Sequence, residues 1–315
     1  MAGEPVRGLN DGMTAASYFT GSGEAGSAAT LKDDERRERL AIAGLSLPAL
    51  LLVAVCLIIP VGSLLALSFI GAQGNLSLEN YQRLVDNKAY LAIFLTTFEI
   101  SAVITIICVL LGYPLAYFIT QLPPRAVGFA MLAIILPFWT SLLVRTYAWM
   151  VLLQKQGLVN SALLKLGVID EPIALLHNYA GTVIGMSHIM LPFLVLPLYG
   201  AMKAIDRDLI RAAANLGAGP IVRFWTVSFP LSLPGLGAGA LIVFVLSLGF
   251  YVTPALLGGG KVTMVAMRIQ KSVALYPNWG AASALAVVLL VVTAIVLLLG
   301  LWIWRRNRGN RPVMS

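Results

Sequence analysis

The chain has 315 residues, of which 59% are hydrophobic and only 11% charged, and its mean hydropathy is +0.87. Soluble domains carry about 25% charged residues, so this composition excludes an ordinary soluble protein and indicates a bilayer protein. The formal net charge is +8, but no basic run is interleaved with aromatic residues, so we expect no binding to nucleic acid.

The first 40 residues differ from the rest, because they are rich in Gly, Ala and Ser and end in the mixed charge run KDDERRERL. We expect residues 1–40 to form a disordered cytoplasmic tail. A cleaved signal peptide has its apolar stretch close to the first residues, so none is predicted. The first apolar stretch is expected to be a retained helix.

Six apolar stretches are long enough to cross the hydrocarbon core, which takes about 20 residues of helix. They lie near residues 43–69, 91–119, 128–153, 179–201, 236–257 and 282–304. The predicted fold is an all-α membrane protein with six transmembrane helices. The predicted divisions are a tail over 1–40, the first transmembrane helix with an external loop over 41–90, a core over 91–304 that includes the loop 202–235, and a basic C-terminus over 305–315.

Lys and Arg outside the spans indicate which loops face the cytoplasm, because these residues collect on that side of the membrane. The tail, the turn at Arg125, the loop 202–235 and the C-terminus together carry twice as many of them as the other three loops. The protein is therefore predicted to be multi-pass in a bacterial cytoplasmic membrane, with both termini inside.

Glu99 and Arg145 are the only full charges well inside the expected helices. The topology places them in consecutive antiparallel helices, each roughly 12 Å from the outer end. We predict an ion pair, with a direct part in a solute pathway as the alternative. Pro137, beside Trp139, either bends a wall of the pathway or makes an ordinary kink. His188 is expected to be an interior, hydrogen-bonded histidine.

The sequence offers no catalytic set of the Ser-His-Asp, Cys-His or paired-carboxylate type. The glycines at 258–260 lack the Gly-Lys-Ser/Thr ending of a phosphate loop. No His, Cys or carboxylate cluster has metal-ligand spacing. We therefore predict no catalytic residue, no metal and no cofactor.

Residues 208–235, DLIRAAANLGAGPIVRFWTVSFPLSLPG, are neither apolar enough to cross a membrane nor polar enough for a plain loop. Their first part has apolar residues at helical spacing: Leu209, Ala212, Ala213 and Leu216. This spacing predicts a short amphipathic helix, with Asp206 as its N-cap and Gly217 at its C-terminal end.

A second short helix is predicted to begin near Pro220, since proline suits a first helical turn. Pro230 and Pro234 are expected to break the chain before the next span. A helix, glycine, helix unit of this kind is either a docking surface with a charged rim or an interfacial helix that lies on lipid headgroups.

The stretch AAANLGAGPIVRFWTVSFPLSLPG resembles the EAA loop in the membrane subunits of binding-protein-dependent ABC importers. That pattern runs Glu-Ala-Ala, three residues, Gly, then a hydrophobic position and a proline. The matching residues are Ala212, Ala213, Gly217, Phe224 and Pro230. Arg211 stands where the family usually has glutamate, which implies a differently charged groove on the ATPase or a role held by the other permease subunit.

Two more stretches, PFWTSLLVRTYAW at 137–149 and FYVTPALLGGG with PNWGAASALAVVLL around 250–290, are similar to the spermidine/putrescine branch of these permeases. The likeness covers roughly residues 45–304. It implies a type I ABC importer permease fold with a MetI-like core formed by the last five helices, and it makes 202–235 the loop that couples to the ATPase.

The resemblance also implies partners: a second homologous permease subunit, two cytoplasmic ATP-binding subunits, an external solute-binding protein and the lipid bilayer. This chain would form half of the pathway for spermidine, putrescine or a related small solute, and ATP hydrolysis would occur in a separate subunit. The alternative is a self-contained secondary transporter or channel. That reading leaves the loop without a purpose, and the sequence has no visible inverted repeat to favour it.

Overall fold

The structure is a computed structural model, and it describes residues 23–71, 73–275 and 278–309. Helices dominate these residues, and an isolated β-bridge between Ile70 and Leu76 is the only strand-like pairing among them. The fold is therefore all-α, as the sequence predicts. The chain divides into two compact units, Met1–Ser63 and Leu64–Ser315.

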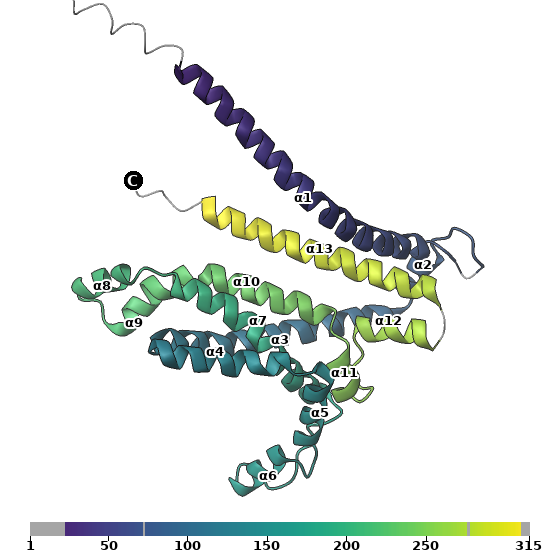
Figure 1. Cartoon of the computed structure of the whole chain (residues 1–315). Coiled ribbons are helices and arrows are strands. Elements are labelled where there is room, and N and C mark those ends of the chain that lie inside the picture. The colour runs from purple at the N-terminus through teal and green to yellow at the C-terminus, as the bar shows by residue number, and fades with distance from the viewer. Residues whose placement is uncertain (1–22, 72, 276–277, 310–315) are drawn as a thin grey trace, which may run out of the picture. The chain divides into compact units, whose positions relative to one another are not determined.

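Most of helix α1 (Gly23–Ser68) belongs to the first unit and is drawn in purple in Figure 1. Its segment Gly44–Ser68 is long and apolar enough to cross a membrane, which confirms the first predicted span. The helix begins at Gly23, so residues 23–40 are helical, although we expected disorder there; residues 1–22 lie outside the described residues. Glu, Lys and Arg, which are frequent in this stretch, have a high intrinsic helix propensity.

The second unit is built around three helices that lie side by side in Figure 1: α3 (Lys88–Gln121), α7 (Tyr179–Lys203) and α10 (Phe229–Leu248). Helix α7 is the central one, because 67% of its most apolar window is buried, against 28% for α3. A Cβ atom at Gly239 of α10 would lie 3.0 Å from the carbonyl oxygen of Leu194 of α7. Glycine thus allows close approach of the two backbones, as small residues do in membrane bundles.

The remaining elements of this unit surround these three helices. They are α2 (Glu79–Asp86), α4 (Pro124–Trp139), α5 (Leu142–Leu152), α6 (Leu158–Lys165), α8 (Arg207–Asn215), α9 (Pro220–Arg223), the π-helix η1 (Phe224–Ser228), α11 (Val252–Leu257), α12 (Val265–Ala274) and α13 (Trp279–Gly309). Helix α13 packs against α12, α10 and α2, while α5 packs against α11.

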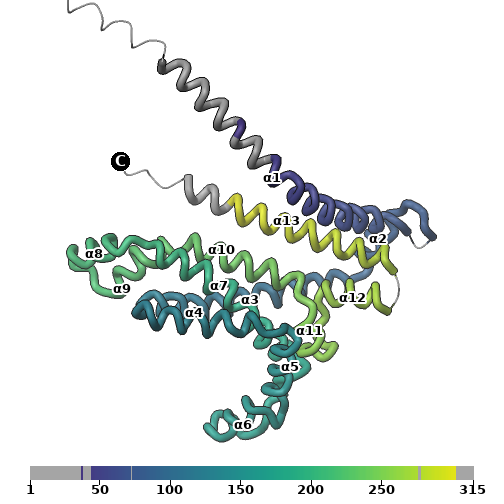
Figure 2. The backbone as a smooth tube through the Cα atoms, viewed as in Figure 1, coloured from purple at the N-terminus to yellow at the C-terminus, as the bar shows by residue number. Residues whose placement is uncertain are grey.

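The predicted third span, 128–153, is wrong as a single helix. Helices α4 and α5 are bent from each other by 99°, and in Figure 2 α5 turns away from the bundle toward α6. The hydroxyl and the N–H of Thr140 both donate to the carbonyl oxygen of Pro137, at 2.6 and 3.2 Å. They close α4 at that point, because a side chain that bonds to the backbone competes with the next helical turn.

The predicted fifth span, 236–257, also needs correction. Helices α9, η1 and α10 form one apolar helical stretch from Pro220 to Leu248, and Pro230 and Pro234 do not break it. The N–H of Phe229 bonds to the carbonyl oxygen of Phe224, five residues back. This π-type turn changes the hydrogen-bond register directly before Pro230, which has no N–H to give. By length and composition, five helices can cross a membrane in the described residues, or six when α4 and α5 count as one span.

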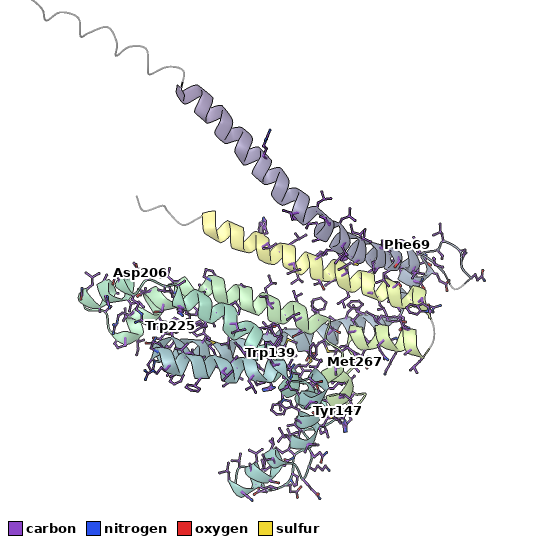
Figure 3. All side chains as sticks on the ribbon, viewed as in Figure 1. Phe69, Trp139, Tyr147, Asp206, Trp225 and Met267 are labelled. Carbon is purple, nitrogen blue, oxygen red and sulfur yellow. The ribbon has the colours of Figure 1, made fainter. Side chains whose placement is uncertain are left out.

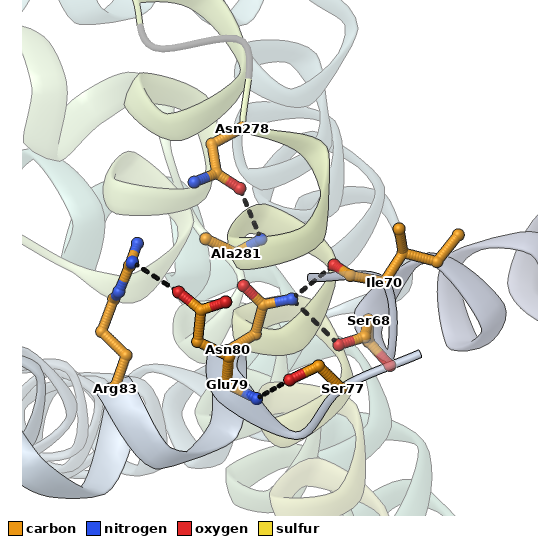
Figure 4. Close-up of polar contacts among 8 residues, drawn as sticks. All are labelled: Ser68, Ile70, Ser77, Glu79, Asn80, Arg83, Asn278 and Ala281. Atoms are coloured by element: carbon orange, nitrogen blue, oxygen red, sulfur yellow. Dashed lines mark hydrogen bonds and ion pairs between the residues drawn. The ribbon is translucent and has the colours of Figure 1, made fainter. Parts of the chain in front are cut away.

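A polar clasp ties the second unit together at the end where α2 meets α13 (Figure 4). The Asn80 side-chain amide donates to the carbonyl oxygens of Ile70, at 2.9 Å, and of Ser68, at 3.2 Å. Asn278 caps the start of α13 by accepting from the N–H of Ala281 at 3.0 Å. Asn80 is only 5% exposed, so these bonds satisfy backbone groups that have little access to water.

Candidate functional site

Helix α8 begins as the sequence predicts. The Asp206 side chain accepts a hydrogen bond from the N–H of Asp208 at 2.9 Å, which satisfies one free donor of the first turn. Arg211, the departure from the EAA pattern, forms an exposed ion pair with Asp208 at 3.0 Å. An exposed pair of this kind contributes at most about 1 kcal/mol, so it orients Arg211 more than it stabilises the helix.

Gly217 forms the elbow after α8, and its φ of +84° lies in the left-handed region. The N–H of Ala218 bonds to the carbonyl oxygen of Ala213, and the N–H of Gly217 bonds to that of Ala214, both at 3.0 Å. These are the two bonds of a Schellman motif. No atom lies within 4 Å of the position that a Cβ would take at Gly217, so backbone conformation alone requires glycine here.

Large apolar side chains project from both short helices and from η1. We call this set the coupling ridge: Leu209, Leu216, Ile221 and Trp225, which are 50%, 89%, 75% and 59% exposed. Figure 3 labels Asp206 and Trp225 at one end of the second unit, away from Met267 and Tyr147. Exposed apolar side chains gathered in this way mark a surface for contact with protein or membrane.

Phe224 connects the coupling ridge to the helical core. Its ring lies 5.2 Å from that of Tyr117 and 5.9 Å from that of Tyr113, both on α3 and both nearly perpendicular to it. The Tyr113 hydroxyl is hydrogen-bonded to the hydroxyl of Ser232 on α10 at 2.9 Å. Pro230 lies in the first turn of α10, half-buried. Phe224 therefore links η1 to α3, and Tyr113 links α3 to α10.

The structure does not bring Glu99 and Arg145 together. In the part of the chain that it describes, the side-chain ion pairs are Arg83–Glu79 and Arg211–Asp208. Glu99 is exposed on α3 and lies close enough to Tyr179 for a side-chain hydrogen bond. Arg145 follows the bend between α4 and α5, so it does not lie on the unbroken third span that the prediction assumed. Trp139, 85% exposed, lies at the end of α4 where the bend begins.

Arg145 instead lies near His188 of α7, a grouping that the sequence did not reveal. The indole N–H of Trp149 donates to Nδ1 of His188 at 3.2 Å, and Arg145 is close enough to His188 for an electrostatic interaction. His188 is hydrogen-bonded, as predicted, but it is exposed, whereas Ser187 and Ile189 beside it are buried. His188 lies roughly 14 Å along α7 from Tyr179, the first residue of that helix. Polar groups this far inside a membrane-spanning helix avoid lipid.

The described residues include no group of three or more His, Cys, Asp or Glu side chains that could hold a metal ion. The second unit carries two sets of side chains that could have a function. One is the coupling ridge, and the other consists of Glu99 on α3, Trp139 on α4, Arg145 on α5 and His188 on α7.

Residues 38–309 match the protein family described as "Binding-protein-dependent transport system inner membrane component". The spermidine/putrescine transport system permease protein PotB of Haemophilus influenzae is 35% identical over 246 residues, which cover 76% of this chain and 86% of that protein. The protein of the same name from Escherichia coli is 34% identical over 232 residues, covering 74% and 83%.

A solved structure with the same fold is that of a bacterial ABC transporter for import of the acidic polysaccharide alginate. The matched chain has a TM-score of 0.66 at 17% identity, and the match covers 88% of this chain and 99% of that one. In a second structure of an alginate transporter, in complex with a periplasmic protein that binds an alginate pentasaccharide, the TM-score is 0.65 at 18% identity. At these identities the likeness concerns the fold alone.

Proposed function

This chain belongs to the family of binding-protein-dependent transport system inner membrane components, and from this premise we propose that it forms one half of the solute pathway of an ATP-driven importer. A second homologous permease subunit forms the other half, two ATP-binding subunits supply the energy, and an external solute-binding protein delivers the solute. The observation that carries the proposal is the coupling ridge, because each of its four apolar side chains is at least 50% exposed and the ridge is joined to the core helices through Phe224.

We propose that the coupling ridge docks into a groove on one ATP-binding subunit. Helix α9 continues through η1 into α10. A force on Ile221 or Trp225 would therefore be transmitted along one continuous helical stretch that ends at Leu248. The contact of Phe224 with Tyr117 passes the same motion to α3. Closure of the ATP-binding subunits on ATP would thus move two of the three core helices and switch access to the pathway.

The proposed orientation places the coupling ridge and both termini in the cytoplasm. It rests on the excess of Lys and Arg in the tail, the 202–235 loop and the C-terminus. Opposite the coupling ridge, the exposed Trp139, His188 and Glu99 and the half-buried Arg145 would face the pathway or the second permease subunit, since polar side chains at membrane depth seldom face lipid.

We propose a polyamine such as spermidine or putrescine as the solute, supported by the names and the extent of the two relatives. Glu99 is the side chain best suited to meet a cationic solute, because it is an exposed carboxylate with no ion-pair partner among the described residues. Arg145, which would repel a polyamine, lies near His188, and it would limit how long the solute stays at that point.

Leu216→Asp tests the docking surface, because Leu216 is 89% exposed and a charge there need not disturb the fold. Interface anchor residues contribute about 2 kcal/mol or more, so we expect the ATP-binding subunit to bind about 30-fold more weakly. Uptake of spermidine by proteoliposomes that contain the reconstituted complex should fall accordingly.

The matched control is Leu76→Asp, since Leu76 is 86% exposed and lies in the loop before α2. It should leave subunit binding and uptake unchanged. Equal binding of the ATP-binding subunit to the parent and to the Leu216 variant would refute the docking proposal.

A further inference from the structure

A cavity of about 800 Å³ lies where the turn between α3 and α4, the end of α7, and α8 come together. We call it the basic pocket. Its polar wall consists of Thr120, Gln121, Tyr199, Lys203, Arg207 and Arg211. No carboxylate is among the described residues that line it, so the formal charge of its wall is positive.

The cations of the basic pocket are only partly neutralised. Arg211 pairs with the exposed Asp208. Lys203 lies 5.8 Å from the centre of the Tyr199 ring, which leaves its charge in place. Neither Lys203 nor Arg207 forms an ion pair within the described part of the chain. The cavity is thus lined by one unpaired ammonium group, of Lys203, and one unpaired guanidinium group, of Arg207. Both kinds of group bind phosphate.

The position of the basic pocket indicates the source of that phosphate. Its wall includes the last residue of α3, Gln121, the first of α4, Pro124, and the last of α7, Lys203, so it lies where three membrane helices end. Val127 and Met202 make an apolar side to the same cavity. A phospholipid has this pattern of groups, with a charged phosphate above apolar chains, and basic pockets between membrane helices bind anionic headgroups.

We propose that the basic pocket binds the headgroup of an anionic phospholipid, with Lys203 and Arg207 as the groups that contact the phosphate. This proposal rests on the proposed function in one respect, the placement of the basic pocket on the cytoplasmic side of the membrane. The headgroup would connect α8 to the α3–α4 turn and so fix the direction in which the coupling ridge points.

The lipid and the ATP-binding subunit use different faces of α8. At 100° per residue, Arg207 and Arg211 lie on the side opposite to Leu209 and Leu216. The first pair lines the basic pocket and the second pair belongs to the coupling ridge. Arg211, which replaces the glutamate usual in the family, is therefore part of the lipid site. An acidic protein segment or a soluble phosphate are the competing occupants.

Native mass spectrometry of the purified complex, titrated with phosphatidylglycerol and separately with phosphatidylcholine, tests the proposal. The parent should retain phosphatidylglycerol in preference. The double variant Lys203→Gln with Arg207→Gln should bind it about 25-fold more weakly, since each basic residue near the surface contributes about a fivefold factor. The charge-conserving variant Lys203→Arg with Arg207→Lys should retain the lipid, which separates loss of charge from loss of fold.

Lys88→Gln is the control, because Lys88 is an exposed lysine at the other end of α3, and it should leave the preference for phosphatidylglycerol unchanged. Equal lipid binding by the parent and the double variant would overturn the proposal, as would an equal loss in the control. Displacement of the lipid by millimolar inorganic phosphate would show a soluble-anion site instead. Loss of the ATP-binding subunit from the double variant, with lipid binding intact, would show a protein occupant.

Discussion

The two ends of the second unit differ in what their side chains do. In the polar clasp, Asn80 is 5% exposed and its amide satisfies two backbone carbonyls within the same chain. In the coupling ridge, Leu216 is 89% exposed and apolar, and α8 is held by its caps while η1 is held by the contacts of Phe224. The clasp is complete within one subunit, whereas the coupling ridge needs a partner to be buried. Substitutions in the clasp should therefore lower stability, and those in the coupling ridge or at the Gly217 elbow should lower transport.

Asn80→Leu should have the largest effect on stability. It removes the donor from two carbonyl oxygens, of Ser68 and Ile70, and each unsatisfied buried group costs about 1–3 kcal/mol. For two such groups we expect a loss of about 2–6 kcal/mol in the free energy of unfolding, measured by equilibrium unfolding in mixed micelles with a denaturing detergent.

Gln82→Leu on the same helix is the control for Asn80→Leu, because Gln82 is exposed and its replacement should change stability by less than about 0.5 kcal/mol. The remaining folded Asn80 variant should transport normally per molecule. A transport defect larger than the loss of folded protein would contradict this distinction, because it would give the clasp a part in transport as well.

Gly217→Val should lower transport more than it lowers stability. Valine at a φ of +84° costs about 1–2 kcal/mol, and the elbow relieves this strain by changing its backbone angles. Solute-stimulated ATP hydrolysis and uptake by the reconstituted complex should both fall, while the amount of inserted protein stays near that of the parent.

The control for this change is Gly219→Val, since Gly219 has a φ of −67° and open space where a Cβ would lie. It should leave uptake unchanged. Should the Gly217 variant transport as well as the Gly219 variant, the elbow would have no part in coupling.

The features that could be predicted from the sequence are those that depend on short stretches of chain. The N-cap at Asp206, the left-handed glycine at 217 and the helix start at Pro220 each depend on a few neighbouring residues. The apolar spans follow from composition for the same reason. A kink at Pro137 could be predicted in the same way, but the 99° size of the bend between α4 and α5 and the π-type turn at Phe224 could not, because they also depend on packing across helices. The grouping of Arg145 with His188 is a consequence of that bend.

Trp149→Phe should have a smaller effect, because it removes one hydrogen bond, to His188, and keeps most of the aromatic contact. We expect a loss of about 0.5–1.5 kcal/mol in the free energy of unfolding. Trp279→Phe is the control, since Trp279 is 54% exposed at the start of α13. A loss in the Trp149 variant no larger than in the control would mean that the hydrogen bond does not stabilise the contact between α5 and α7.

The smallest expected effect is an interaction energy near zero between Glu99 and Arg145. The sequence places them level in neighbouring helices, but in the structure Glu99 lies beside Tyr179 and Arg145 near His188. Residues that share no partner have additive effects to within about 0.5 kcal/mol. The stability losses in Glu99→Gln and Arg145→Met should therefore add in the double variant. A buried pair would behave otherwise, because breaking it costs about 3–5 kcal/mol while replacing both members is nearly neutral. Recovery of stability in the double variant would show that the two charges meet in the assembled complex, and additive losses with impaired uptake would assign them separate places along the pathway.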